Sequence, residues 1–282
     1  MTRVRLGLIG DNIAASRSPA LHRIAGRLCG LDVTYELLIP RKTGMNFDPL
    51  FDWCATSSFR GVNVTYPYKE LVTAKVRVDD PLVSRIGAVN TVIFGEAVPA
   101  GHNTDYSGFI AAWRETFGAT PPGRVAIAGA GGVGRAIAFA LVALEATEIR
   151  ITDLDAGKAT RLAADLRGAG DGIAAGDWPD MESAVHGADG IVNCTQLGMV
   201  GYPGSAIPAA VLGGQRWAFD SVYTPVETLF RADAIAAGLD FMSGYELYFH
   251  QGVQAFRIFT GMAPPDLARL RRLLEDPDAG QD

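Results

Sequence analysis

The chain has 282 residues, of which 48% are hydrophobic and 20% are charged, so it can form one large or two medium globular domains. The formal net charge is −6 and no stripe of lysine and arginine is present, which argues against nucleic acid or an anionic membrane as a partner. Three scattered cysteines match neither a zinc pattern nor a disulfide framework, and no apolar run has the length of a signal peptide or a membrane span, so we expect a cytoplasmic protein.

Strand and helix patterns alternate along the chain, which predicts an α/β fold with mainly parallel sheet. In the first part a helix is expected from Ser18, interpreted as its N-cap, through Pro19 to Gly30. The strands expected there are Val4–Ile9, Thr34–Ile39, the segment around Val62 and Val64, and a hairpin of Val89–Phe94 with Ala97–Gly101.

After Asp105 a helix opens a second α/β segment, with strands near residues 125, 149, 190 and 217, and from Gly244 the chain is helical again. We therefore predict two lobes. Residues 1–103 would form a substrate-binding and catalytic domain, 104–243 a Rossmann-like dinucleotide-binding domain, and 244–282 helices that return to the first lobe. A cleft between two lobes is a preferred place for a ligand.

The motif with the clearest chemistry is Gly129-Ala130-Gly131-Gly132-Val133-Gly134, between a short apolar strand and an alanine-rich helix. Its glycines fit G-x-G-x-x-G, which permits a tight turn, a close backbone approach to a pyrophosphate, and close helix–strand packing. Asp153 ends the next strand about 20 residues later, where such folds place a ribose-binding acid. A purely structural glycine turn is the alternative interpretation.

Lys69 and Asp105 are the first candidates for catalysis. Lys69 is expected in the first turn of a helix after a strand, where the helix dipole and partial burial would lower the pKa of its ammonium group. From its position alone, however, a solvated surface lysine is the favoured interpretation. Asp105 is either the N-cap of the following helix or a carboxylate that faces the ligand, and the residues alone do not separate the two interpretations.

Several polar residues could bind a hydroxylated acid. Ser16 lies near a helix start without a capping role of its own and could donate to a carboxylate, whereas Ser18 is well explained as the N-cap. Thr65 and Asn90 lie at strand ends or loops, although each alone is as well explained as a turn or ladder residue. The four histidines show no metal-ligand spacing, so no metal site is predicted.

Taken together and in order, these segments resemble the shikimate dehydrogenase family. The resemblance extends from Gly7 to about Gly261. It is carried by the segments Ser16–Pro19, Asn63–Lys69, Gly87–Thr91, Gly101–Asp105, Gly129–Gly134, Asn193–Met199, Asp220–Pro225 and by Gln251.

The resemblance implies roles for individual residues. Lys69 and Asp105 would be the catalytic pair, and Ser16 and Ser18 would hold the substrate carboxylate. Thr65, Asn90, Tyr223 and Gln251 would contact ring hydroxyls or support the pair, and Thr195, Val222 and Gly244 would join the glycine motif in binding the dinucleotide. The reaction implied is hydride transfer between shikimate or quinate and a nicotinamide cofactor.

The segment Asp153-Leu154-Asp155 departs from the pattern of family members that use NADP, in which an Asn-Arg-Thr-type stretch holds the 2′-phosphate. An aspartate accepts hydrogen bonds from ribose hydroxyls and repels a phosphate, so NAD is expected as the preferred cofactor. Lys158 and Arg161 keep NADP possible. Other segments, such as Tyr66–Lys69, look closer to the quinate/shikimate dehydrogenase branch.

Two other hypotheses remain. One is an NADP-dependent biosynthetic shikimate dehydrogenase or a relative acting on an amino analogue of shikimate. The other is a catalytically silent dinucleotide-binding module, against which the intact pair of Lys69 and Asp105 argues. The oligomeric state is expected to be a monomer or a homodimer.

Overall fold

The computed structural model describes residues 1–169 and 173–275. The chain divides into two compact units, one formed by Met1–Thr104 with Phe249–Asp282 and the other by Asp105–Tyr248. The boundaries fall within two helices, α5 (Thr104–Phe117) and α10 (Gly244–Thr260), so the first unit is discontinuous in sequence. None of the described helices has the length and apolar character needed to cross a membrane.

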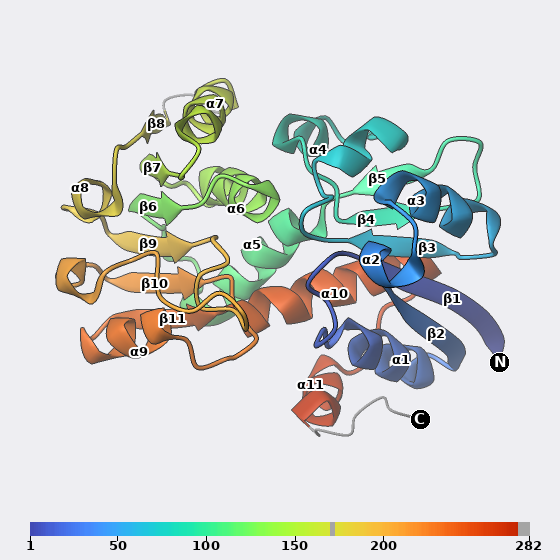
Figure 1. Ribbon diagram of the computed structural model, residues 1–282. Helices are drawn as coiled ribbons and strands as arrows, with labels where there is room; N and C mark the ends of the chain where they lie inside the picture. Colours follow the sequence, from blue (N-terminus) through green and yellow to red (C-terminus); the bar gives the residue numbers. More distant parts are fainter. Residues whose placement is uncertain (170–172, 276–282) are drawn as a thin grey trace. The chain divides into compact units, whose positions relative to one another are not determined.

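The first unit contains a five-stranded sheet in the order β2-β1-β3-β4-β5 (Figure 1). Three strands are parallel, namely β1 (Thr2–Ile9), β2 (Leu31–Leu38) and β3 (Gly61–Val64). The fourth, β4 (Thr91–Ile93), is antiparallel to β3 and to β5 (Ala100–His102), which confirms the predicted hairpin. All five strands overlap the predicted ranges, but β2 begins at Leu31 rather than at Thr34, and β5 is shifted from the predicted Ala97–Gly101 to Ala100–His102.

The first helix, α1 (Ser18–Leu28), corrects one prediction. Its N-cap is Arg17, and Ser18 is the first helical residue rather than the cap. The hydroxyl of Ser16 accepts the backbone N–H of Ser18 at 3.3 Å, so Ser16 supplies the oxygen that the helix start needs. The remaining helices of this unit are α2 (Pro40–Thr43), α3 (Phe47–Thr56), the 3-10 helix η1 (Leu71–Lys75), α4 (Pro81–Ile86) and α11 (Leu267–Glu275).

Two apolar layers hold the sheet of the first unit. On one face Phe51 of α3 joins a buried cluster with Val62 and Phe94. Elsewhere α1 and α10 pack so closely that a Cβ at Gly252 would lie 2.6 Å from Leu21, and a Cβ at Gly61 would lie 2.6 Å from the Phe259 ring. Small residues at these contacts let the backbone of the sheet and the helices approach closely.

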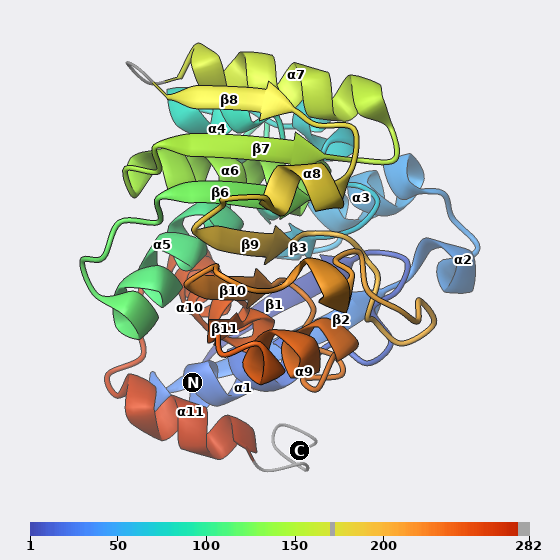
Figure 2. The same cartoon turned by 90° about the vertical axis from the view of Figure 1, so that its left-hand side faces the viewer.

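The second unit contains a six-stranded parallel sheet in the order β11-β10-β9-β6-β7-β8. Figure 2 shows this order, with α8 (Met181–Val185) and α9 (Leu229–Ala236) over one face and α6 (Gly132–Ala143) behind. The strand order reverses between β6 and β9, which is where doubly wound sheets bind ligands. The strands are β6 (Arg124–Ala128), β7 (Glu148–Thr152), β8 (Ala174–Asp177), β9 (Gly190–Asn193), β10 (Trp217–Asp220) and β11 (Asp240–Ser243).

Candidate active site

The register of the first unit brings the carboxyl ends of its parallel strands to one edge of the sheet. Ile9 of β1 lies opposite Leu38 of β2 and Val64 of β3. Thr91 pairs with Asn63 across the antiparallel strands, so Asn90 comes to the same edge. Ligands of open α/β sheets bind at the carboxyl ends of the strands.

Lys69 follows β3 at this edge and is buried, with 8% of its surface exposed. Its carbonyl accepts the N–H of Val89 at 2.8 Å, which holds the lysine segment beside Asn90. The interpretation as a solvated surface lysine is therefore wrong. Its expected place in the first turn of a helix is also wrong, because Lys69 lies in a turn before the 3-10 helix that begins at Leu71. A buried ammonium is costly unless a partner compensates its charge, so burial is typical of a functional lysine.

Asp105 is the second residue of α5 and is 5% exposed. The helix begins at Thr104, so Asp105 lies inside the first turn and is not the N-cap. A carboxylate in the first turn is stabilised by the positive end of the helix dipole. The N–H of Thr104 donates to Oδ1 of Asn90 at 2.8 Å, and this bond anchors the helix start to the strand edge.

The other residues expected to bind the acid in this unit are Ser16, Ser18, Thr65 and Gln251. The Ser16 hydroxyl donates to the Ser18 hydroxyl at 3.2 Å, so the two serines form one polar pair before α1. The N–H of Thr65 donates to the carbonyl of Ile9 at 2.9 Å, which ties it to the end of β1. Oε1 of Gln251 on α10 accepts from the hydroxyl of Thr104 at 3.4 Å.

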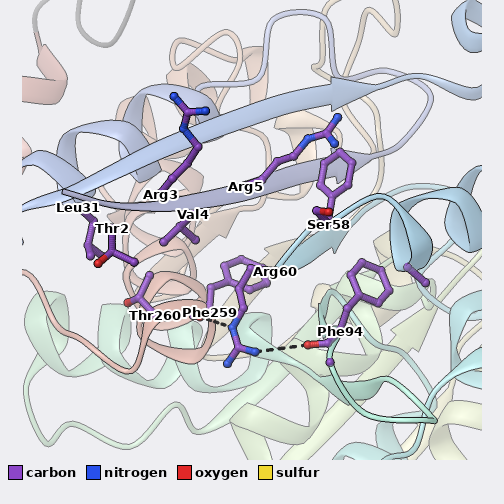
Figure 3. A pocket seen from close by; sticks show the side chains of 13 residues that line it. Thr2, Arg3, Val4, Arg5, Leu31, Ser58, Arg60, Phe94, Phe259 and Thr260 are labelled. Atoms are coloured by element: carbon purple, nitrogen blue, oxygen red, sulfur yellow. Dashed lines mark hydrogen bonds between the residues drawn. The ribbon is translucent and has the colours of Figure 1, made fainter.

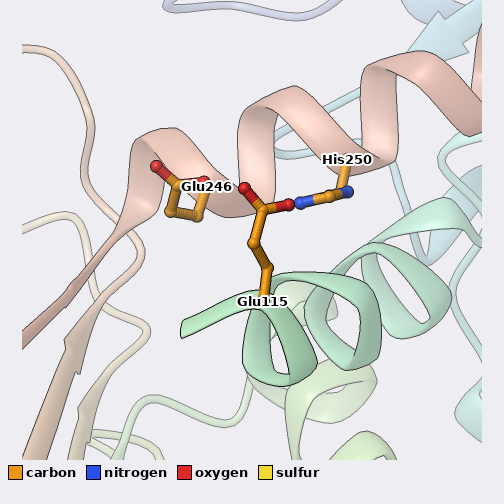
Figure 4. Close-up of side chains that lie close together, drawn as sticks. All are labelled: Glu115, Glu246 and His250. Atoms are coloured by element: carbon orange, nitrogen blue, oxygen red, sulfur yellow. The ribbon is translucent and has the colours of Figure 1, made fainter. Parts of the chain in front are cut away.

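Tyr223 belongs to the second unit, where its ring stacks on Tyr248 with centroids 4.8 Å apart. Tyr248 lies near the start of α10, a helix whose first turns also carry Glu246. Figure 4 shows Glu246 beside Glu115 of α5, with carboxylate oxygens within 4.8 Å of each other. Glu115 is exposed and Glu246 is half-buried, so this acidic pair lies near solvent. We assign no catalytic or binding role to it.

The glycine motif lies at the crossing point between β6 and β9 in the second unit. Gly129 has φ of +100°, and a Cβ there would lie 2.9 Å from the carbonyl of Cys194, so only glycine fits. A Cβ at Gly134 would lie 2.0 Å from the Gly129 oxygen, whereas a Cβ at Gly131 would meet no described atom within 4 Å. The backbone at Gly131, the N-cap of α6, is therefore open to a ligand, and these residues fit the pyrophosphate of a dinucleotide.

Asp153 is held against this motif by two backbone donors. Its Oδ2 accepts the N–H of Ala130 at 2.7 Å, and its Oδ1 accepts the N–H of Asp155 at 2.8 Å. Asp155 caps α7 (Ala156–Arg167) by accepting the N–H of Lys158 at 3.3 Å. Leu154, where the sequence resemblance led us to expect an arginine in an NADP-binding protein, is fully exposed. The segment thus presents acids and an apolar side chain next to the glycine motif.

A buried carboxylate that the sequence analysis missed organises the other cofactor candidates. Asp220 is 1% exposed and accepts from the side chains of Thr228 at 2.6 Å and Asn193 at 2.9 Å, and from the N–H of Val222 at 3.0 Å. Burial raises its pKa, while these three hydrogen bonds act in the opposite direction. Oδ1 of Asn193 in turn accepts from the hydroxyl of Thr195 at 2.7 Å.

Gly244 completes the set of expected cofactor residues, because a Cβ there would lie 2.6 Å from the carbonyl of Asp220. The segments that carry Thr195, Val222 and Gly244 are thereby held together by Asn193 and Asp220. Asn193 and Asp220 both end strands of the parallel sheet, and that position is the signal by which the sequence could have revealed them.

Comparison with known proteins agrees with this geometry. The model of the shikimate dehydrogenase substrate-binding domain matches residues 8–92. A quinate/shikimate dehydrogenase (NAD(+)) of Corynebacterium efficiens is 37% identical over 274 residues, which cover 95% of this chain and 96% of the relative. The chain belongs to the shikimate dehydrogenase family.

Solved structures of the shikimate dehydrogenase family share the fold. Quinate dehydrogenase from Corynebacterium glutamicum in complex with NAD superposes with a TM-score of 0.86 at 35% identity, covering 96% of this chain and 98% of that one. Shikimate 5-dehydrogenase from Thermus thermophilus in complex with NADP(H) and shikimate has a TM-score of 0.83 at 32% identity, with the same coverage. The relatives of known structure thus include one in complex with NAD and one in complex with NADP(H).

A surface depression of about 580 Å³ lies elsewhere in the first unit (Figure 3). It is lined by the first residues of β1, such as Arg3 and Arg5, and by Arg60 and Phe259. Arg3 and Arg5 are paired with Asp32 and Glu36, and Arg60 donates to the carbonyls of Phe259 and Phe94. The depression is at the end where the parallel strands begin, opposite to the edge that carries Lys69 and Asn90.

Proposed function

We propose that this protein is a NAD-preferring dehydrogenase that interconverts shikimate with 3-dehydroshikimate, quinate with 3-dehydroquinate, or both. The observation that carries the proposal is the burial of Lys69 at the ligand-binding edge of a sheet, in a family whose named relatives oxidise such acids. A catalytically silent module has no use for a lysine removed from water at this position.

The residues divide the chemistry as follows. The hydroxyls of Ser16 and Ser18 bind the carboxylate of the acid, and Thr65, Asn90 and Gln251 donate to or accept from its ring hydroxyls. Tyr223, in the second unit, is the further candidate for a contact with a ring hydroxyl or for support of the catalytic pair. The nicotinamide supplies the hydride donor or acceptor when the cofactor is bound.

Lys69 and Asp105 handle the proton. On oxidation, Nζ of Lys69 accepts the proton of the reacting ring hydroxyl, and on reduction it returns that proton to the ketone oxygen. Asp105 orients the ammonium group and compensates its charge in the buried site. Lys69 and Asp105 are both buried, so bulk water does not compete for the proton.

The preference for NAD rests on Asp153. Its carboxylate is already fixed by the N–H groups of Ala130 and Asp155, so it meets a ribose 2′-hydroxyl without reorganisation and opposes a 2′-phosphate. Leu154 offers no charge to a phosphate. Lys158 and Arg161 on α7 are the residues that would support NADP instead, the cofactor in the complex of the Thermus relative.

Cys29 and Cys54 carry thiols rather than disulfides, which supports a reducing, cytoplasmic location.

Initial rates with shikimate or quinate, each with NAD or NADP, test the proposal. We expect turnover with at least one acid and a kcat/KM for NAD at least about tenfold above that for NADP, corresponding to ~1.4 kcal/mol. The physical reason is the repulsion between Asp153 and the 2′-phosphate, next to Leu154, which offers no positive charge.

A Lys69→Ala variant is the internal reference for this assay. It should lose several kcal/mol of transition-state stabilisation, or roughly a thousandfold in kcat, while its affinity for NAD stays within about twofold of wild type. Turnover of neither acid would refute the substrate assignment, and a preference for NADP would refute the role of Asp153. Wild-type kcat in Lys69→Ala would reject the lysine as the proton carrier.

A further inference from the structure

A chain of buried hydrogen bonds in the first unit leads from β2 to Asn90. The hydroxyl of Tyr35 donates to Oδ1 of Asn63 at 2.8 Å. Nδ2 of Asn63 donates to the hydroxyl of Thr91 at 2.9 Å and to the carbonyl of Asn90 at 3.1 Å. The hydroxyl of Thr91 then donates to Oδ1 of Asn90 at 3.0 Å. The chain thus links residues of β2, β3 and β4, passes β1, which lies between β2 and β3, and ends on a residue proposed to bind substrate.

The direction of each bond follows from the donor inventory. A hydroxyl has one proton, so Thr91, which accepts from the amide of Asn63, gives its proton to Asn90. Oδ1 of Asn90 then accepts from the Thr91 hydroxyl and from the N–H of Thr104 at 2.8 Å, and the Thr104 hydroxyl lies 3.2 Å away as a third donor. The oxygen of the Asn90 amide is therefore fixed on the inner side.

The nitrogen of Asn90 is left as a donor on the other side of the amide. One N–H of its Nδ2 donates to the hydroxyl of Thr104 at 3.0 Å. The single proton of that hydroxyl has two acceptors in reach, Oδ1 of Asn90 at 3.2 Å and Oε1 of Gln251 at 3.4 Å. An amide nitrogen carries two protons, so a second N–H of Asn90 remains to donate. A flipped Asn90 amide would present an oxygen there instead and would lose both inner bonds.

Burial makes this chain rigid. Tyr35 is 2% exposed, Asn63 7%, Thr91 0% and Asn90 3%, so water does not replace a lost partner readily. The ring of Tyr35 is itself clamped by stacking on His22, with centroids 4.7 Å apart and planes 17° apart. An interior packed in this way does not let the phenol swing away from Asn63.

We infer that Tyr35, Asn63 and Thr91 are positioning residues that set the amide of Asn90 so that its Nδ2 donates to a ring hydroxyl of the substrate. The inference rests on the proposed function, because it needs Asn90 to contact the hydroxy acid. The three residues act through Asn90, so their effect belongs to binding of the acid and not to binding of the dinucleotide.

Thr91→Val tests the inference, with Thr91→Ser as its matched partner. Valine keeps the shape of threonine and removes the hydroxyl, whereas serine keeps the hydroxyl. Thr91→Val should raise KM for the acid about tenfold, the effect of one lost buried hydrogen bond, and leave KM for NAD within about twofold. Thr91→Ser should restore KM for the acid to near the wild-type value. Tyr35→Phe, one bond further away, should act in the same direction with a smaller rise.

Val33→Ala controls for loss of stability, since Val33 is buried on the same strand two residues from Tyr35 and takes no part in the chain. It should lower Tm without raising KM for the acid. A wild-type KM in both Thr91→Val and Tyr35→Phe, or an equal rise in Thr91→Ser, would overturn the inference. Absence of turnover by the wild-type protein would instead overturn the proposed function.

Discussion

His22 shows how one buried side chain couples the first unit to pH. It is 1% exposed on α1, stacks on Tyr35, and its Nδ1 has no hydrogen-bond partner among the residues that the structure describes. Burial lowers its pKa from 6.5 to about 3, because the imidazolium would have no water around it. The folded protein therefore keeps this ring neutral at pH values where the unfolded chain protonates it.

The pH dependence of stability follows from that difference. The contribution of neutral His22 is fully present above pH 6.5 and is lost as the pH falls toward 3, because only the unfolded chain binds the proton in that range. The free energy of unfolding should fall by up to about 1.4 kcal/mol per pH unit below pH ~6 on account of this one group. His22→Phe should flatten the slope, as measured by urea unfolding between about pH 7.5 and about pH 4.5. The exposed His186→Gln should keep the wild-type slope, and an unchanged slope in His22→Phe would contradict the assignment.

At the scale of residues, the sequence identifies candidate catalytic side chains better than it identifies their burial and their hydrogen-bond partners. Lys69 and Asp105 could be named from motifs, yet whether Lys69 was solvated and whether Asp105 was a cap could not be decided without the fold. The sequence did not predict a role for Tyr35 or Thr91, because tyrosine and threonine are common in β-strands whether or not their hydroxyls have a function. Asp220 was missed because its partners, Asn193 and Thr228, are brought to it by separate strands and helices.

Two glycines at the start of α6, Gly131 and Gly134, are required for different reasons. Gly134 is required by packing, since a Cβ would lie 2.0 Å from the backbone oxygen of Gly129. Gly131 faces open space, so its small size matters only when a ligand approaches.

Gly131→Ala and Gly134→Ala should therefore differ. Gly131→Ala should leave Tm within about 2 °C of wild type, as for a surface substitution, and weaken NAD at least about tenfold, because its methyl group occupies the place of the pyrophosphate. Gly134→Ala should lower Tm and weaken NAD together, because the helix must move away from β6. Thermal unfolding and NAD titration of both variants provide the measurement. Equal loss of Tm in both, or unchanged NAD affinity in Gly131→Ala, would show that the motif is a structural turn.

Elements with a strong pattern were predictable and weak ones were not. The sequence predicted the strands with apolar runs, such as β1, β6 and β7, and also the helices that begin near Thr104 and Gly244. The short edge strand β8, with the sequence Ala-Ala-Gly-Asp, has little β-propensity and exists because β7 offers it a partner. Such strands depend on tertiary context and not on their own residues.

At the scale of the whole chain, the first unit joins the two ends of the sequence. Its C-terminal part, from Phe249, follows a boundary inside α10, and no change of pattern marks a boundary within a continuous helix. α11 contacts α1, and the guanidinium of Arg17 donates to the carbonyl of Leu274 near the end of α11. Arg17 lies between Ser16 and Ser18, so a segment about 250 residues away along the chain helps to hold the proposed carboxylate-binding serines.

Arg17→Ala should therefore weaken binding of the acid, although Arg17 is not itself proposed to contact the acid. Loss of the bond to Leu274 frees the loop before α1, so KM for shikimate or quinate should rise about threefold to tenfold while KM for NAD stays within about twofold. Arg27→Ala removes an exposed arginine from the same helix and should leave both constants at wild-type values. Steady-state kinetics on the two variants decide the matter, because a contact that merely adds surface charge would give the same result for both arginines. If KM for the acid does not change in Arg17→Ala, the C-terminal helix supports the fold of this unit and not the position of its serines.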